Sequence, residues 1–121
     1  GVVMGEPSGG LISIDFDDEE PLAQFLKLNP KAVETLRTHA KRGCNLWFRM
    51  KGDYPRLQFI SRAGSPFAEW RSTGGLTVIS GIHPSGERYI SNNKAPLEID
   101  FNEIKWSKSE IFHRNILVPA K

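Results

Sequence analysis

"LISIDFDDEE", residues 11–20, has the apolar character of a buried strand in its first part and a run of acids in its second. Asp15 and Asp17 lie within the predicted strand 11–17, where removing a carboxylate from water is costly unless a partner compensates its charge. Both side chains project from one face of the strand, with their backbone positions roughly 7 Å apart, because the two residues are two positions apart. Carboxylates placed in this way can share one or two hard divalent cations. A strand end at which both acids face water is the alternative explanation.

A helix is predicted directly after this strand, because acids and a proline follow it and both are favoured in the first turn of a helix. Leu22, Phe25 and Leu26 then have the i, i+3, i+4 spacing of an apolar helical face. A second helix is predicted over residues 30–41, and Gly43 is placed to end it. Two helices are therefore expected between the acidic strand and the rest of the chain.

Apolar residues recur at every second position after Gly43, which is typical of strands. Segments rich in turn-forming residues separate five predicted strands, residues 45–50, 56–61, 67–72, 76–80 and 88–90. A turn of helix is expected near residues 101–106. The order of elements (a strand, two helices and an antiparallel meander) predicts an α+β fold.

Size and composition are those of a globular protein with an ordinary hydrophobic core. The chain has 121 residues, of which 39% are hydrophobic and 25% charged, so a single domain over residues 1–121 is expected. A net charge of +2 is too small to indicate a nucleic-acid partner by itself. Residues 15–20 are mostly acidic, whereas the charged residues within 37–62 are basic except Asp53. This distribution suits a site that binds metal and polyanion together, or a solvated surface.

The use of cysteine and histidine disfavours several classes of site. Cys44 is the single cysteine, so no internal disulfide can form and a reducing compartment is expected. The spacings of Cys44 and the three histidines match no zinc-ligand pair, and no oriented base identifies Cys44 as a nucleophile. No apolar run reaches the roughly 20 residues that cross a bilayer, and the N-terminus lacks the layout of a signal peptide. A cytoplasmic protein without a membrane partner is expected.

Two further segments carry polar residues that could serve a site. Glu69 is a third acid in an apolar segment, and a pair of metal-binding carboxylates would recruit such a residue. A half-exposed strand with Glu69 in water is the commoner explanation of one glutamate. "GIHPSGERYI", residues 81–90, is predicted to be an exposed hairpin tip, where Arg88 is available to bind a phosphate or a carboxylate.

Three segments, in this order, resemble the bifunctional primase/polymerase (prim-pol) branch of the archaeo-eukaryotic primase superfamily. "GEPSGGLISIDFD" is similar to the G-x-x-S-G loop and D-x-D strand of that family, and "RGCNLWFRM" to its second motif. "AEWRSTGGLTVISGIHPSGERY" is similar to its acid-x-R-x-x-G-G strand pair and the H-P-S-G-x-x-Y turn after it. The resemblance covers roughly residues 5–90, and its last block is the most distinctive.

This resemblance implies an RRM-like primase–polymerase core that performs metal-dependent nucleotidyl transfer in the replication of a phage, plasmid or prophage. Asp15, Asp17 and Glu69 would be the catalytic acids and would hold two Mg²⁺ or Mn²⁺ ions, which activate the 3′-hydroxyl and neutralise the triphosphate. The residues implied to bind nucleotide or phosphate are Asn45, Arg49, Arg71, His83 and Arg88. The implied partners are nucleoside triphosphates, a single-stranded DNA template and a replicative helicase domain or subunit.

Two departures from the family pattern leave a second hypothesis open. Asn45 stands where the family has a histidine that contacts the phosphates, and asparagine carries no positive charge. Family members also have an α/β segment before the loop at residues 5–10, so the chain is expected to be an excised, split or reduced form of the domain. The alternative function is a catalytically weak or inactive primase-like domain that binds nucleic acid or nucleotide. A domain whose acids are all solvated is the third and least favoured interpretation.

Overall fold

The computed structural model describes residues 2–39, 43–62, 65–74, 76–77, 89–106, 110–112 and 117–118. Its elements, in chain order, are β1 (Val2–Val3), η1 (Glu6–Ser8), β2 (Leu11–Phe16), α1 (Glu19–Leu28), η2 (Pro30–Glu34), β3 (Arg37–His39), β4 (Cys44–Lys51), β5 (Tyr54–Pro55), β6 (Gln58–Arg62), β7 (Ser65–Arg71), β8 (Leu76–Thr77), β9 (Ile90–Ser91), β10 (Leu97–Asp100), η3 (Phe101–Glu103), β11 (Glu110–Phe112) and β12 (Leu117–Val118). The fold is mixed α/β, with α1 as the one α-helix of the described residues and η1, η2 and η3 as short 3-10 helices.

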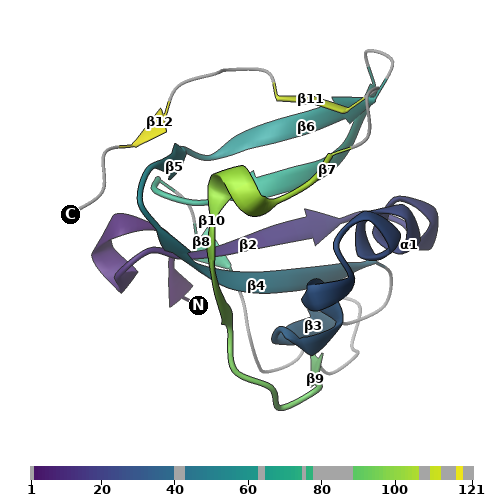
Figure 1. Cartoon of the computed structure of the whole chain (residues 1–121), viewed down its shortest axis with the longest axis horizontal. Helices are drawn as coiled ribbons and strands as arrows, with labels where there is room; N and C mark the ends of the chain where they lie inside the picture. Colours follow the sequence, from purple (N-terminus) through teal and green to yellow (C-terminus); the bar gives the residue numbers. More distant parts are fainter. Residues whose placement is uncertain are drawn as a thin grey trace.

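The main sheet places the first long strand in the middle rather than at an edge (Figure 1). Eight strands of described residues form it in the order β11-β6-β7-β2-β4-β3-β9, and β10 pairs with β4. All pairs are antiparallel except β10 with β4, which is parallel. Two small antiparallel pairs, β1 with β8 and β12 with β5, lie outside it. The expected antiparallel strands are thus confirmed, but β2 lies between β4 and β7, so the strands are not in the order of a simple meander.

The period of two along β2 divides its side chains between the two faces of the sheet. Ile12, Ile14 and Phe16 belong to the main core together with Phe25 of α1, whose ring centroid lies 5.4 Å from that of Phe16. This packing explains why α1 covers one face of the sheet (Figure 1). The alternate residues of β2 lie on the opposite face, which holds a smaller apolar cluster around Trp47 and, as described below, the polar residues.

The predicted second helix over residues 30–41 is wrong. The chain forms only the 3-10 helix η2 there and then enters β3, and residues 40–42 lie outside the described residues. Thr35 is extended (φ −85°, ψ 165°); its hydroxyl donates to the Trp47 carbonyl and accepts from the Leu97 N–H at 2.9 Å. These bonds to β4 and β10 fix an extended backbone where a helix would have continued. Several β-branched residues in this segment also lower its helical propensity.

The other predicted elements are present with shifted ends where the described residues cover them, and the predicted hairpin tip falls largely on residues 81–88, outside the described residues. The strand 11–17, the first helix, the strands 45–50, 56–61 and 67–72 and the helical turn near 101–106 correspond to β2, α1, β4, β6, β7 and η3. Only Leu76–Thr77 of the predicted strand 76–80 is described, and β9 begins at Ile90 instead of Arg88, which lies outside the described residues. Among the helices of the described residues, none has the length and apolar character needed to span a membrane.

Candidate active site

A row of polar residues crosses three neighbouring strands on the face of the sheet opposite α1. Asp15 of β2 is the register partner of Glu69 on β7 and of Asn45 on β4. Side chains directly opposite each other in an antiparallel pair have their Cβ atoms about 5 Å apart. The fold therefore brings together Asp15, Asn45 and Glu69, which are far apart in the sequence.

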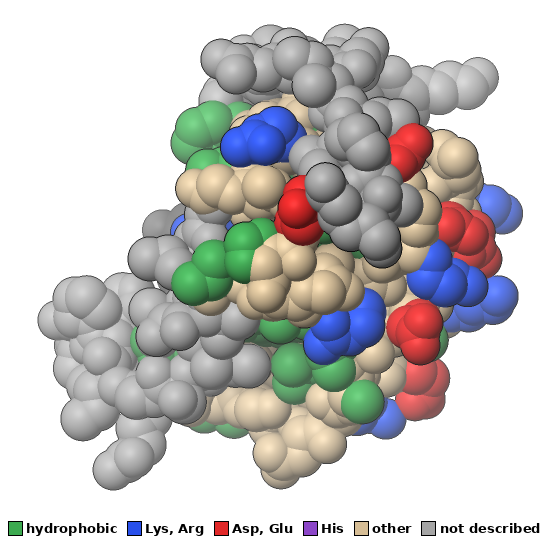
Figure 2. Space-filling view, turned by 90° about the vertical axis from the view of Figure 1, so that its left-hand side faces the viewer, with side chains coloured by type: hydrophobic (Ala, Val, Ile, Leu, Met, Phe, Trp, Pro, Cys, Tyr) green, Lys and Arg blue, Asp and Glu red, His purple; other side chains and the backbone are tan. Residues whose placement is uncertain are grey.

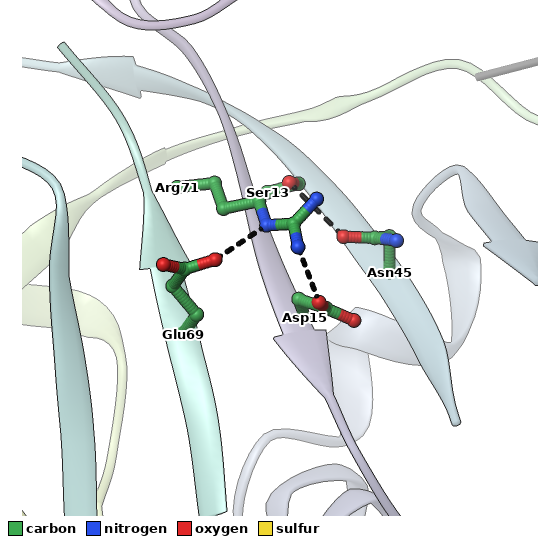
Figure 3. A network of polar contacts seen from close by, with 5 residues as sticks. All are labelled: Ser13, Asp15, Asn45, Glu69 and Arg71. Carbon is green, nitrogen blue, oxygen red and sulfur yellow. Dashed lines mark hydrogen bonds and ion pairs between the residues drawn. The ribbon is translucent and has the colours of Figure 1, made fainter. Parts of the chain in front are cut away.

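Arg71 joins the two acids of this row (Figure 3). Its Nη2 donates to Asp15 Oδ2 and its Nε to Glu69 Oε1, both at 2.7 Å. The side chains of Arg71, Asp15 and Glu69 are 28%, 26% and 24% exposed, so solutes can reach the network from solvent. Beside it, the Ser13 hydroxyl donates to Asn45 Oδ1 at 3.2 Å.

Burial makes the ionised form of Asp15 expensive, and this raises the pKa of its carboxyl above the usual value. The positive charge of Arg71 lowers that pKa, whereas the negative charges of Asp17 and Glu69 raise it further. The balance remains on the side of a raised pKa. A further positive charge beside Asp15 would lower this pKa.

Asp17 takes no part in the Arg71 network. It lies beyond the end of β2, its side chain is exposed, and its backbone N–H donates to the Phe67 carbonyl at 3.4 Å. The part of the chain that the structure describes contains no group of three or more acids, histidines or cysteines gathered closely enough to hold a metal ion. Arg71 thus joins Asp15 and Glu69, whereas Asp17 lies outside this network but near enough for its charge to raise the pKa of Asp15.

The donor set at Asp15 and Glu69 nevertheless fits a hard divalent cation. Mg²⁺ and Mn²⁺ prefer carboxylate oxygens. Asp15 Oδ1 and Glu69 Oε2 accept no hydrogen bond from any described residue, so each acid retains an oxygen for a ligand. The guanidinium of Arg71 already occupies a position between the two carboxylates, which shows that this place accommodates positive charge.

Arg49, a predicted phosphate ligand, is used to hold the loop at residues 5–10. Its Nη1 donates to the Ser8 carbonyl at 2.8 Å and to the Gly9 carbonyl at 3.2 Å. The other side of the loop is fixed by the Glu6 N–H, which donates to Thr73 Oγ1 at 3.1 Å. The glycine-rich loop is thereby tied both to β4 and to the segment after β7.

Of the other four predicted phosphate ligands, the structure describes Asn45 and Arg71. Asn45 is buried in the polar row, and Arg71 contacts both acids there. His83 and Arg88 lie outside the described residues. On the face shown in Figure 2, described side chains of both charge signs are interspersed rather than separated into an acidic and a basic patch.

Sequence reasoning missed Ser13 and the pairing of Arg71 with the acids. The period of two that places Asp15 and Asp17 on one face of a strand also places Ser13 with Asp15 and Glu69 with Arg71. That signal was present in the sequence. The register between β2 and β7, which makes Ser13 the partner of Arg71, could not be obtained from it.

A comparison with family models identifies the same family that the sequence motifs resemble. The model of the Prim-Pol family, described as bifunctional DNA primase/polymerase, N-terminal, matches residues 1–104. No curated protein matches the chain. Membership of this family implies nucleotidyl transfer of the primase and polymerase type, with nucleotides and DNA as ligands. Because the match covers most of the sequence, the chain belongs to the Prim-Pol family of bifunctional DNA primase/polymerase domains.

Proposed function

We propose that this protein performs metal-dependent nucleotidyl transfer, in primer synthesis and DNA polymerisation, for the replication of a phage, plasmid or prophage element. The main sheet would be the RRM-like catalytic core. The observation that carries the proposal is the pairing of Asp15 with Glu69 in register across β2 and β7. The two acids share the guanidinium of Arg71. Two partly buried carboxylates held together on a rigid sheet are well placed to bind a divalent ion.

Asp15 and Glu69 would hold Mg²⁺ or Mn²⁺ through their carboxylate oxygens. A metal bound there supplies charge neutralisation for the triphosphate and activation of the attacking 3′-hydroxyl. Asp17 would add a carboxylate from the exposed end of the same strand. Arg71 would contact the triphosphate, because a guanidinium binds phosphate oxygens in a forked geometry.

A second candidate function is nucleotide or nucleic-acid binding without useful polymerisation. Asn45 favours it, since only its amide NH₂ can donate to a phosphate, while its Oδ1 accepts from Ser13. An amide donates a hydrogen bond but contributes no positive charge to the site. His83, at the predicted hairpin tip, and Arg88 remain proposed phosphate ligands.

Primer extension and dinucleotide synthesis with Mn²⁺ distinguish the two candidates. We expect the wild type to extend a primer on a single-stranded template, and Asp15→Asn and Glu69→Gln to lose at least about 100-fold in rate, because each removes a metal ligand. Glu98→Gln is the matched control, since Glu98 is an exposed acid on β10. Asn45→His should increase the rate by restoring a cationic phosphate contact.

The outcome that supports the second candidate is equally specific. Wild type and Asn45→His would both bind single-stranded DNA or nucleotide, and neither would extend a primer. Equal rates in the wild type and the Asp15→Asn and Glu69→Gln variants would contradict metal-dependent catalysis at this pair of acids.

We also propose that residues 1–121 form one domain. The matched region ends at residue 104, yet β11 pairs with β6 and β12 with β5, so strands beyond the match join the same structure. A helicase domain or subunit remains a proposed partner, on the basis of the family resemblance alone.

A further inference from the structure

Arg71 lies between the two acids that are proposed to bind the metal ion. It makes ion pairs of 2.7 Å with both Asp15 and Glu69, and these are the two acids whose donor set fits the ion. A divalent cation and the guanidinium would repel each other strongly if both lay within about 4 Å of the same carboxylates. The two cations therefore compete for the same pair of acids.

The structure also gives Arg71 a route out of this position. Arg71 is the last residue of β7, and its side chain is long and partly exposed. Its Nη1 donates no hydrogen bond to any described residue, so the guanidinium is held through only two of its three nitrogens. Rotation about side-chain bonds would suffice to move the guanidinium away from the acids, and the strand would not have to shift.

We propose that Arg71 couples metal binding to nucleotide binding. In the free protein the guanidinium neutralises Asp15 and Glu69 and opposes metal binding. A triphosphate offers it a new anionic partner, so the arginine moves to the phosphates while the metal takes its place between the acids. Metal and nucleotide then bind together, and the site does not collect divalent ions when no substrate is present. The inference rests on the proposed function, because it requires the same acids to bind metal.

The coupling has a thermodynamic consequence that can be measured. If nucleotide binding removes Arg71 from the acids, the nucleotide must raise the affinity for metal, and metal must raise the affinity for nucleotide by the same factor. Part of this cooperativity comes from direct contact between metal and phosphates. The part that Arg71 contributes disappears when its charge is removed.

Mn²⁺ titration monitored by the EPR signal of free Mn²⁺ tests the proposal, with and without a non-hydrolysable nucleoside triphosphate. Without nucleotide, Arg71→Gln should bind Mn²⁺ about 10-fold more tightly than the wild type, since typical coupling factors are of this order. Addition of the nucleotide should raise Mn²⁺ affinity by a smaller factor in Arg71→Gln than in the wild type.

Arg56→Gln is the matched control, because Arg56 is exposed, lies outside the network and carries the same charge. Its Mn²⁺ affinity should stay within about twofold of the wild type, which separates a local effect from a change in net charge. Arg71→Lys is a second test variant, and circular dichroism verifies folding of each protein. A lysine cannot reproduce the fork between two carboxylates, so Arg71→Lys should also bind Mn²⁺ more tightly than the wild type.

Failure of this proposal can be distinguished from failure of the proposed function. If wild type, Arg71→Gln and Arg71→Lys bind Mn²⁺ with equal affinity, and Asp15→Asn loses it, the coupling role of Arg71 is wrong while the metal site stands. If none of the folded proteins binds Mn²⁺, even with the triphosphate present, both the metal site and the coupling are wrong.

Discussion

Asp15 is a partly buried acid, and its ionisation in the folded protein is opposed by that burial. Because burial raises the pKa of Asp15 in the folded protein above its usual value of 3.8, the folded state binds a proton more tightly than the unfolded state. The contribution of Asp15 to stability is therefore greatest when the carboxyl is protonated. It declines as the pH rises from the usual value through the raised pKa.

Asp15→Asn is expected to be as stable as the wild type at pH 7, or more stable, while losing Mn²⁺ binding. Asparagine is neutral at every pH, and its side-chain oxygen can still accept from Arg71. Urea denaturation between pH 4 and 7 should show the free energy of unfolding of the wild type falling relative to that of Asp15→Asn as the pH rises. A relative rise over the same range would mean that the ion pair with Arg71 outweighs burial.

Cys44 is expected to be chemically inert in the folded protein. Burial raises the pKa of its thiol from 9.0 to about 11, so the reactive thiolate is scarce at pH 8. Iodoacetamide should leave Cys44 unmodified in the native protein and alkylate it in urea, as measured by mass spectrometry. Rapid alkylation of the native protein would show that Cys44 is accessible and ionised, contrary to its buried position in the core.

At the scale of elements, Gly43 determines how the chain enters β4. Its φ is +62°, and a Cβ atom there would lie 1.8 Å from the Phe16 carbonyl oxygen at the end of β2. Gly43→Ala should reduce the free energy of unfolding by about 3 kcal/mol or more, because it adds a clash with backbone to the cost of a positive φ. Thermal and urea denaturation measure the loss.

Gly9→Ala separates these two costs. Gly9 has a similar φ of +68°, but a Cβ there would meet only the end of the flexible Arg49 side chain, at 3.2 Å. This control should lose only about 1 kcal/mol. If both variants lose the same free energy of unfolding, the close contact between Gly43 and β2 contributes nothing to the loss in Gly43→Ala.

Local pattern predicted most of the elements but misassigned the second helix. The alternation in "NLWFRM" and the helical stripe after residue 18 are properties of short segments, and both gave the right structure. The segment after η2 is decided instead by Thr35, whose hydroxyl bonds to β4 and β10. Those partners are close only in the folded chain, so no local pattern could reveal them.

The same distinction applies to the candidate site. Asp15 and Glu69 could be proposed from their positions in strands, because the residue types and the period of two are visible in the sequence. Their pairing through Arg71 depends on the register of β2 against β7, which is fixed by the packing of the whole sheet. Asp17 is predicted from its spacing to Asp15 and from the resemblance of the D-x-D motif, and the structure places it just beyond the end of β2.

For the whole molecule, we expect a single cooperative unfolding transition. Residues from α1 and from strands between β2 and β10 share one core, and the ring of Phe101 in η3 lies 5.2 Å from that of Trp70 in β7. Urea transitions followed by tryptophan fluorescence and by far-UV circular dichroism should therefore coincide. In Trp106→Phe, the remaining fluorescence comes from Trp70 in the main core and Trp47 in the smaller cluster. Coincident transitions in this variant would show that both clusters unfold together. Two separate midpoints would contradict a single domain.

The central position of β2 has a consequence for synthesis of the chain on the ribosome. β2 emerges before either of its partners, and it can be enclosed on both edges only after residue 71 has been added. Until then an apolar strand has open edges, which are prone to intermolecular pairing and aggregation. The acids from Asp15 to Glu20 lie within and directly after it, and their mutual repulsion between nascent chains discourages such pairing. The acidic stretch would thus protect the nascent strand before the folded site exists.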